Sequence, residues 1–110
     1  EGVVEAITIN SVPWRIIFPN KRSPLARFGG GGVSGKRSQS CNWKMLADLA
    51  THTSIPVIGS GVWHYQDIET LFNIGARAIA FGSLFLKYPW RPTLYVRRWL
   101  REQKNFEEHE

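Results

Sequence analysis

The sequence predicts an α/β protein in which helices cover a parallel sheet, and three observations carry this prediction. Three short runs, 3–10, 54–61 and 76–83, consist mostly of apolar residues. One helical pattern lies between the second and third runs, and another follows the third. The last two runs end in glycine and serine. Continuously apolar strands that alternate with helices are typical of parallel sheets. The chain has 110 residues, of which 43% are hydrophobic, so it can form one small domain with a core.

The first half of the chain predicts one strand and one long loop. Residues 3–10 are rich in β-branched side chains and predict a buried strand. Residues 11–39 contain three prolines and a glycine cluster and show no helical period, so we expect a loop with a short extended piece at 14–18. Loops longer than about 12–15 residues in compact domains are usually functional or disordered.

The second half alternates helices with strands. We expect helices over 40–52, 65–75 and 91–110, and strands over 54–61 and 76–83. Ser40 is the expected N-cap of the first helix, and Gly75 suits the left-handed position after the second. The expected apolar helix positions are Met45, Leu46, Leu49, Ala50, Ile68, Leu71, Phe72, Leu94, Val96, Trp99 and Leu100. This order alone leaves open a doubly wound sheet and a (β/α)8 barrel, which needs about 250 residues.

Charge and cysteine content narrow the class of protein. The net charge is +5, and no acid occurs between Ala6 and Ala47, where seven bases lie. Such a stretch suits a polyanion, either nucleic acid or a phosphorylated cofactor, or forms a solvated basic face. The lone Cys41 excludes an internal disulfide, and no His/Cys cluster has zinc spacing, so we expect no metal. Without a recognisable signal peptide or an apolar run of about 18 residues, the expected localisation is cytoplasmic, with no membrane segment.

The stretch "FGGGGVSGKRSQS" (28–40) has the glycines of two phosphate-binding motifs but fits neither well. A P-loop needs a preceding strand and a hydroxyl after its lysine, whereas Arg37 follows Lys36. A dinucleotide fingerprint needs an acid at the end of the next strand, and none ends 54–61.

A third interpretation uses the ends of the predicted strands. In parallel α/β folds, ligands bind at the carboxyl ends of strands, and glycine lets the backbone approach them closely. We therefore expect three segments to meet at one phosphate site: Ser34-Gly35, Gly59-Ser60-Gly61 and Gly82-Ser83. We expect a helix after each of the last two, with exposed N–H groups and a helix dipole for the anion. The alternative is that glycine and serine are simply common in such turns.

Four stretches, "AITINSV", "GGGGVSGK", "SIPVIGSGV" and "DIETLFNIGARAIAFGSLF", resemble dihydroorotate dehydrogenases in their order and spacing. These enzymes are flavin mononucleotide (FMN) barrels of pyrimidine biosynthesis, and the resemblance covers roughly residues 5–87. It implies that Asn10 and Ser11 bind the substrate, dihydroorotate or its product orotate. It also implies that Gly35 lies against the flavin and that Gly61, Gly82 and Ser83 cradle its phosphate. Val62 replaces a second glycine that the family often has after the second strand.

The resemblance implies an oxidoreductase in which a base removes the C5 proton of dihydroorotate and hydride passes from C6 to the flavin. The base and a supporting lysine would precede residue 1, so we assign no catalytic residue and do not give that role to Cys41. Residues 1–110 are then the C-terminal three βα units of a TIM (β/α)8 barrel. We expect the isolated segment to be inactive, to need the remainder of the barrel as its partner, and to associate through its open edge.

Two alternatives remain open at this stage. One is another FMN barrel reductase, either dihydropyrimidine dehydrogenase-like or dihydrouridine synthase-like. The other is a basic nucleic-acid-binding domain, supported by aromatic residues among the bases (Trp14, Phe18, Phe28 and Trp43). The glycines favour the flavin, which makes a nucleic-acid partner the weaker hypothesis. The sequence leaves open the electron acceptor and whether the protein is a homodimer.

Overall fold

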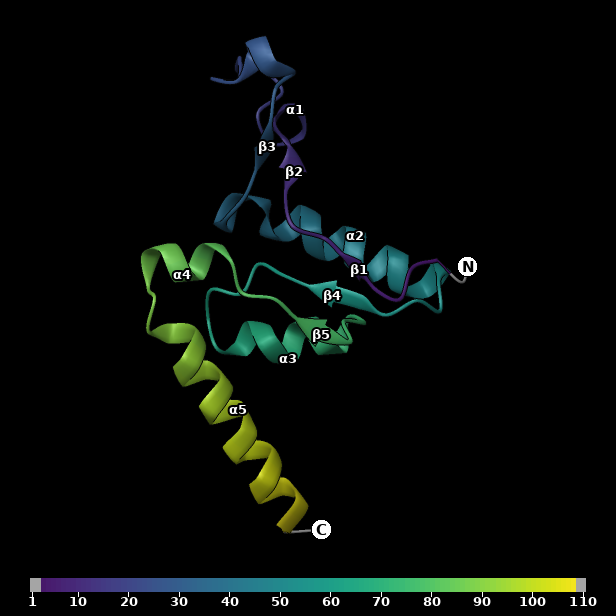
Figure 1. Ribbon diagram of the computed structural model, residues 1–110, viewed down its shortest axis with the longest axis vertical. Coiled ribbons are helices and arrows are strands. Elements are labelled where there is room, and N and C mark those ends of the chain that lie inside the picture. Colours follow the sequence, from purple (N-terminus) through teal and green to yellow (C-terminus); the bar gives the residue numbers. More distant parts are fainter. Residues whose placement is uncertain (1–2, 109–110) are drawn as a thin grey trace.

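The computed structural model describes residues 3–108 and has a mixed α/β fold around a small parallel sheet (Figure 1). The sheet has the strand order β1 (Ile7–Thr8), β4 (Val57–Gly59), β5 (Ala78–Ile79). Ile7 pairs with Val57 and Ile58 pairs with Ala78, in parallel register in both cases. The paired segments are shorter than the predicted strands 3–10, 54–61 and 76–83. In this sheet only β4 has a neighbour on each side, which limits the length of the ladders.

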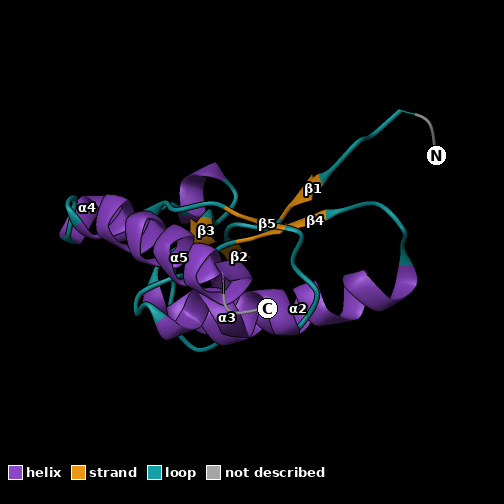
Figure 2. Cartoon of the chain, turned by 90° about the horizontal axis from the view of Figure 1, so that it is seen from below, coloured by secondary structure: helices purple, strands orange, loops and turns teal. Residues whose placement is uncertain are grey.

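The two helices that connect these strands lie on the same side of the sheet (Figure 2). Helix α2 (Gln39–His52) leads from β1 to β4, and helix α3 (Gln66–Asn73) leads from β4 to β5. Crossovers between parallel strands are almost always right-handed, so strands added in sequence order keep their helices on one face. A doubly wound sheet instead reverses its strand order to place helices on both faces.

The core lies between the sheet and these helices. Leu46 of α2, Leu71 of α3 and Val57 of β4 are almost completely buried there. Gly59 faces the same core, where an added Cβ would lie 2.9 Å from Leu71 and 3.1 Å from Leu46. Gly75, after α3, has φ = +120°, which confirms its expected left-handed position.

A hairpin arm, residues 12–33, projects from the body beyond the end of β1 (Figure 1). Strands β2 (Val12–Pro13) and β3 (Gly32–Val33) pair antiparallel, with a helical turn, α1 (Trp14–Ile17), and a 3-10 turn, η1 (Ala26–Phe28), between them. The expected extended piece at 14–18 is therefore wrong. The Phe18 N–H bonds to the Trp14 carbonyl, and the two rings pack at 4.5 Å, which stabilises a helical turn.

The start of α2 also differs from expectation. A 3-10 turn, η2 (Lys36–Ser38), runs directly into the helix, so Ser38 rather than Ser40 is the N-cap residue, without a side-chain capping bond. Met45 was expected to be buried but is 45% exposed. The buried face of α2 instead carries Asn42 and Leu46, four residues apart.

The chain ends in two helices, α4 (Ser83–Lys87), which was not predicted, and α5 (Arg91–Glu108). Helix α5 contacts α3 through aromatic residues: Tyr95 packs edge-on against Tyr65, and Trp99 stacks on Phe72. This contact confirms Trp99 as an apolar packing position. The other three expected positions are wrong, because Leu94, Val96 and Leu100 lie off this face and are exposed.

The arm and α5 extend in opposite directions from the sheet (Figure 1), and the molecule measures 56 × 37 × 22 Å. Among the described residues, no helix is both long and apolar enough for a bilayer crossing.

Candidate functional site

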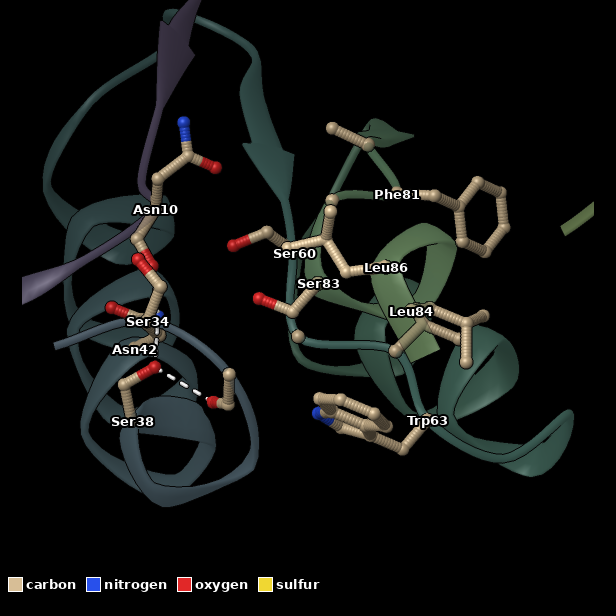
Figure 3. A pocket seen from close by; sticks show the side chains of 15 residues that line it. Asn10, Ser34, Ser38, Asn42, Ser60, Trp63, Phe81, Ser83, Leu84 and Leu86 are labelled. Atoms are coloured by element: carbon tan, nitrogen blue, oxygen red, sulfur yellow. Dashed lines mark hydrogen bonds between the residues drawn. The ribbon is translucent and has the colours of Figure 1, made fainter. Parts of the chain in front are cut away.

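A pocket of about 430 Å³ lies where the loops after β1, β4 and β5 meet the loop before α2 (Figure 3). Segments far apart in the chain supply its walls: Asn10, Ser34-Gly35, Ser60-Gly61 and Gly82-Ser83. The remaining lining residues are Ser38, Asn42, Val62, Trp63, Ala80, Phe81, Leu84 and Leu86. The pocket therefore forms at the carboxyl ends of the parallel strands, where ligands of such sheets bind.

Seven of the nine predicted site residues line this pocket, and two do not. Gly59 is buried in the core beneath the sheet, since residues alternate between the two faces of a strand. Ser11 is exposed at the base of the arm, where its Oγ would lie 3.0 Å from a Cβ added at Gly32. The glycine stretch is likewise divided: Gly29–Gly31 lie in the arm, and only Gly35 reaches the pocket.

Gly35 approaches the opposite wall closely. Its φ is +95°, and an added Cβ would lie 3.7 Å from the Ser83 Oγ and 3.8 Å from the Trp63 ring. Gly61 also has a positive φ of +85°, and its added Cβ would lie 3.3 Å from the Trp43 Nε1. Both positions therefore favour glycine for their backbone conformation, and at Gly61 an added Cβ would also be crowded.

Side chains from α2 hold the loop after β4. Gln39 Nε2 donates to the Gly61 carbonyl at 2.6 Å, and Trp43 Nε1 donates to the Ser60 carbonyl at 2.9 Å. Asp67 Oδ2 accepts from the backbone N–H groups of Trp63 and His64, both at 2.9 Å. The first two bonds hold the carbonyls of Ser60 and Gly61 against the side chains of α2.

Asn42 fixes the loop after β1 in a similar way. Its side chain is 3% exposed, and its Nδ2 donates to the Asn10 carbonyl at 2.6 Å. Its Oδ1 is buried and has no hydrogen-bond partner among the described residues. Sequence reasoning missed Asn42, although a polar residue four positions before the core residue Leu46 was a usable signal.

Several backbone N–H groups around the pocket have no hydrogen-bond acceptor within residues 3–108, and four of them come from the loops after β4 and β5. These four belong to Gly61, Val62, Gly82 and Ser83. The hydroxyls of Ser34 and Ser83 are also without partners in the described part of the chain. A set of free donors at one end of a small polar pocket suits an anion with several oxygen acceptors.

The electrostatics of the pocket come from uncharged polar groups. No charged side chain from the described residues lines it, and the nearby Arg37 lies over the Phe18 ring of the arm, 5.2 Å from its centroid. The expected helix after Gly61 is present as α3, which begins at Gln66, but Asp67 of its first turn accepts the N–H groups of Trp63 and His64. Helix α4 follows Gly82 but is only five residues long.

Fold and site together define a parallel α/β unit with a polar pocket at its strand ends. Among curated proteins, the chain is 33% identical over 89 residues to dihydroorotate dehydrogenase A (fumarate) of Lactiplantibacillus plantarum. It is 35% identical over 83 residues to the dihydroorotate dehydrogenase B (NAD(+)) catalytic subunit of Methanosarcina acetivorans, and 34% identical to that of Methanosarcina mazei. The chain belongs to the dihydroorotate dehydrogenase family.

These matches cover 80%, 74% and 74% of this chain but only 29%, 27% and 26% of the three relatives. The chain thus spans less than a third of the length of the curated relatives it matches. No family model matches the chain. No solved structure matches it either.

Proposed function

We propose that residues 1–110 form the FMN-phosphate-binding part of a dihydroorotate dehydrogenase that oxidises dihydroorotate to orotate. The single observation that carries this proposal is the set of four free N–H groups at Gly61, Val62, Gly82 and Ser83 beside a pocket without acidic side chains. A phosphate monoester dianion has the oxygens to accept all four, and backbone donors require no counter-ion side chain.

The residues that are present fit an FMN group. Gly35 leaves a wall without a Cβ, against which the phosphate end of the ribityl chain could lie. Val62, which stands where a second glycine is usual, belongs to the core cluster and is 3% exposed, so its N–H stays available. When bound, the flavin would supply the redox chemistry, accepting the hydride from the substrate.

The residues of this chain would bind and orient the cofactor and the substrate, and none of them would take part in the bond changes. Gly61, Gly82 and Ser83 would hold the phosphate, with Ser34 and Ser60 beside them. Asn10 lies at the opposite end of the pocket from Trp63 (Figure 3) and would hydrogen-bond the pyrimidine ring. We assign no proton transfer to any residue of this segment, so the isolated chain should not turn over dihydroorotate.

The fold supports placing this segment in a barrel. The strands β1, β4 and β5 follow sequence order, and α2 and α3 cover one face. On the other face, Thr8, Ile58 and Ala78 form one row across the sheet, and Thr8 and Ala78 are exposed. A barrel has this arrangement, with helices outside and an inner wall that the remaining strands enclose.

The test compares FMN with riboflavin, which lacks the phosphate. A complete barrel containing this segment should bind FMN at least about tenfold more tightly than riboflavin in equilibrium dialysis, because only FMN engages the free N–H groups. Equal affinity for the two, or no FMN binding, would overturn the proposal. Turnover of dihydroorotate against uracil by a complete barrel containing this segment would distinguish the family's reaction from that of a related reductase.

A second candidate function rests on the arm. It carries Arg15, Lys21, Arg22 and Arg27 without any acid, and Phe28 at its tip is 71% exposed. Single-stranded nucleic acid binds such surfaces through phosphate contacts and base stacking. Oligonucleotide affinity that falls steeply with salt, without flavin binding, would favour this function.

A further inference from the structure

The indole of Trp63 closes one end of the pocket. In Figure 3 its ring lies below Ser83 and across from Ser38, while Asn10 lies at the far end. A Cβ added at Gly35 would contact both the Trp63 ring, at 3.8 Å, and Ser83, at 3.7 Å for Oγ and 3.9 Å for Cβ. The pocket therefore narrows to little more than the width of one atom where these three residues meet.

Trp63 is held in this position from two directions. Its N–H donates to the Asp67 carboxylate at 2.9 Å, and its carbonyl accepts from the Tyr95 hydroxyl at 3.0 Å. The side chain also packs against the hydrophobic core. The two hydrogen bonds fix the backbone of Trp63, and the packing against the core holds its ring.

The closed end lies next to the free donors. Val62 directly precedes Trp63 in the chain, and Ser83 contacts the same point beside Gly35. An anion held by the N–H groups of Val62 and Ser83 would thus have the indole behind it. A phosphate monoester carries one substituent and fits a pocket with one opening, whereas a phosphodiester needs a second exit.

We propose that Trp63 restricts this pocket to terminal phosphate monoesters and thereby excludes dinucleotides such as FAD. This inference rests on the FMN function proposed above and adds the residue that determines which class of phosphate ligand the pocket accepts. Selectivity would arise by steric exclusion of the competing ligand rather than by an added contact to the preferred one.

Competition between FMN and FAD in equilibrium dialysis tests the proposal with a complete barrel that contains this segment. Wild type should bind FMN at least about tenfold more tightly than FAD, and Trp63→Ala should reduce that ratio to about threefold or less by gaining FAD affinity. Trp63→Phe, with a smaller ring, should lie between them. Trp90→Ala is the matched control, since Trp90 is 59% exposed and lies outside the pocket lining.

The possible outcomes distinguish a failure of this inference from a failure of the proposed FMN function. Loss of FMN binding by wild type would overturn both. Normal FMN binding with an unchanged FMN-to-FAD ratio in Trp63→Ala would overturn only the role of Trp63. If circular dichroism shows that Trp63→Ala does not fold, the ratio in Trp63→Phe decides: a fall supports the proposal, and no change overturns it.

Discussion

The carboxylate of Asp67 lies 2.9 Å from the backbone nitrogen of Trp63 and accepts its hydrogen bond. The same oxygen accepts from the N–H of His64 at 2.9 Å and from Gln39 Nε2 at 3.2 Å. One side chain thus connects α2, the loop after β4 and α3. In this loop the N–H groups of Gly61 and Val62, which lie closer to β4, remain without an acceptor among the described residues.

Replacing Asp67 with Ala should lower the free energy of unfolding by about 1.5–3 kcal/mol, because three donors lose a charged acceptor. Urea denaturation would measure this loss. Asp67→Asn is the matched control: its amide oxygen can still accept, so it should lose less. Equal stability of the Ala variant and wild type would show that water replaces the carboxylate without cost.

Gly75→Ala should destabilise the fold by about 2–4 kcal/mol, which combines a positive-φ cost with overpacking. The added Cβ would lie 2.5 Å from the Cβ of Ala50. Ala50→Gly in the same chain should recover the steric part, so a double-mutant cycle should show favourable coupling. Additive losses would mean that backbone strain alone explains the effect.

Tyr65 should titrate at unusually high pH. Burial, followed by its hydrogen bond to Glu102, raises the pKa of Tyr65 from 10.0 to about 12. The raised pKa favours the neutral, folded form, so this contribution to stability is full below pH 10 and is lost as the pH rises from 10 towards about 12. Ultraviolet absorbance of ionised tyrosine would follow it, with Tyr65→Phe identifying the signal.

Glu102 offers the complementary measurement. Its hydrogen bonds from Tyr65 and Arg98 lower the pKa of this carboxyl below 4.5, so its contribution to stability is present above pH 4.5 and is lost as the pH falls through the lowered pKa. Glu102→Gln should bring the Tyr65 titration back towards 10.0. An unchanged Tyr65 titration in that variant would assign the shift to burial alone.

Gly35→Ala should weaken FMN binding about tenfold, because the new methyl group would occupy the narrow part of the pocket. Its backbone conformation, with φ = +95° and ψ = −160°, should cost an alanine about 1–3 kcal/mol of stability. Gly29→Ala is the matched control, since Gly29 has φ = +101° in the arm and no atom within 4 Å of an added Cβ. It should show a similar stability loss with unchanged FMN affinity.

The sequence predicted the βα order and the position of the pocket, because both follow from local patterns. Apolar runs mark β4 and β5, and glycines at 61 and 82 mark the strand ends. The arm was not predicted, because its two-residue strands pair through contacts of Val12 with Val33 and of Pro13 with Gly32, which are about twenty positions apart in the chain. The role of Trp63 was not predicted either, because it depends on contacts with Asp67, Tyr95 and Gly35 that form only in the folded chain.

The opposed projections of the arm and α5 have a thermodynamic consequence. The radius of gyration is 16.1 Å, whereas a compact domain of this length has about 13 Å. Such an extended molecule removes less apolar surface from water on folding, so its heat capacity of unfolding should fall below the usual value of about 1.3–1.6 kcal/mol/K for this length. Its calorimetric transition should therefore be broad, and small losses of contact should move the melting temperature by many degrees.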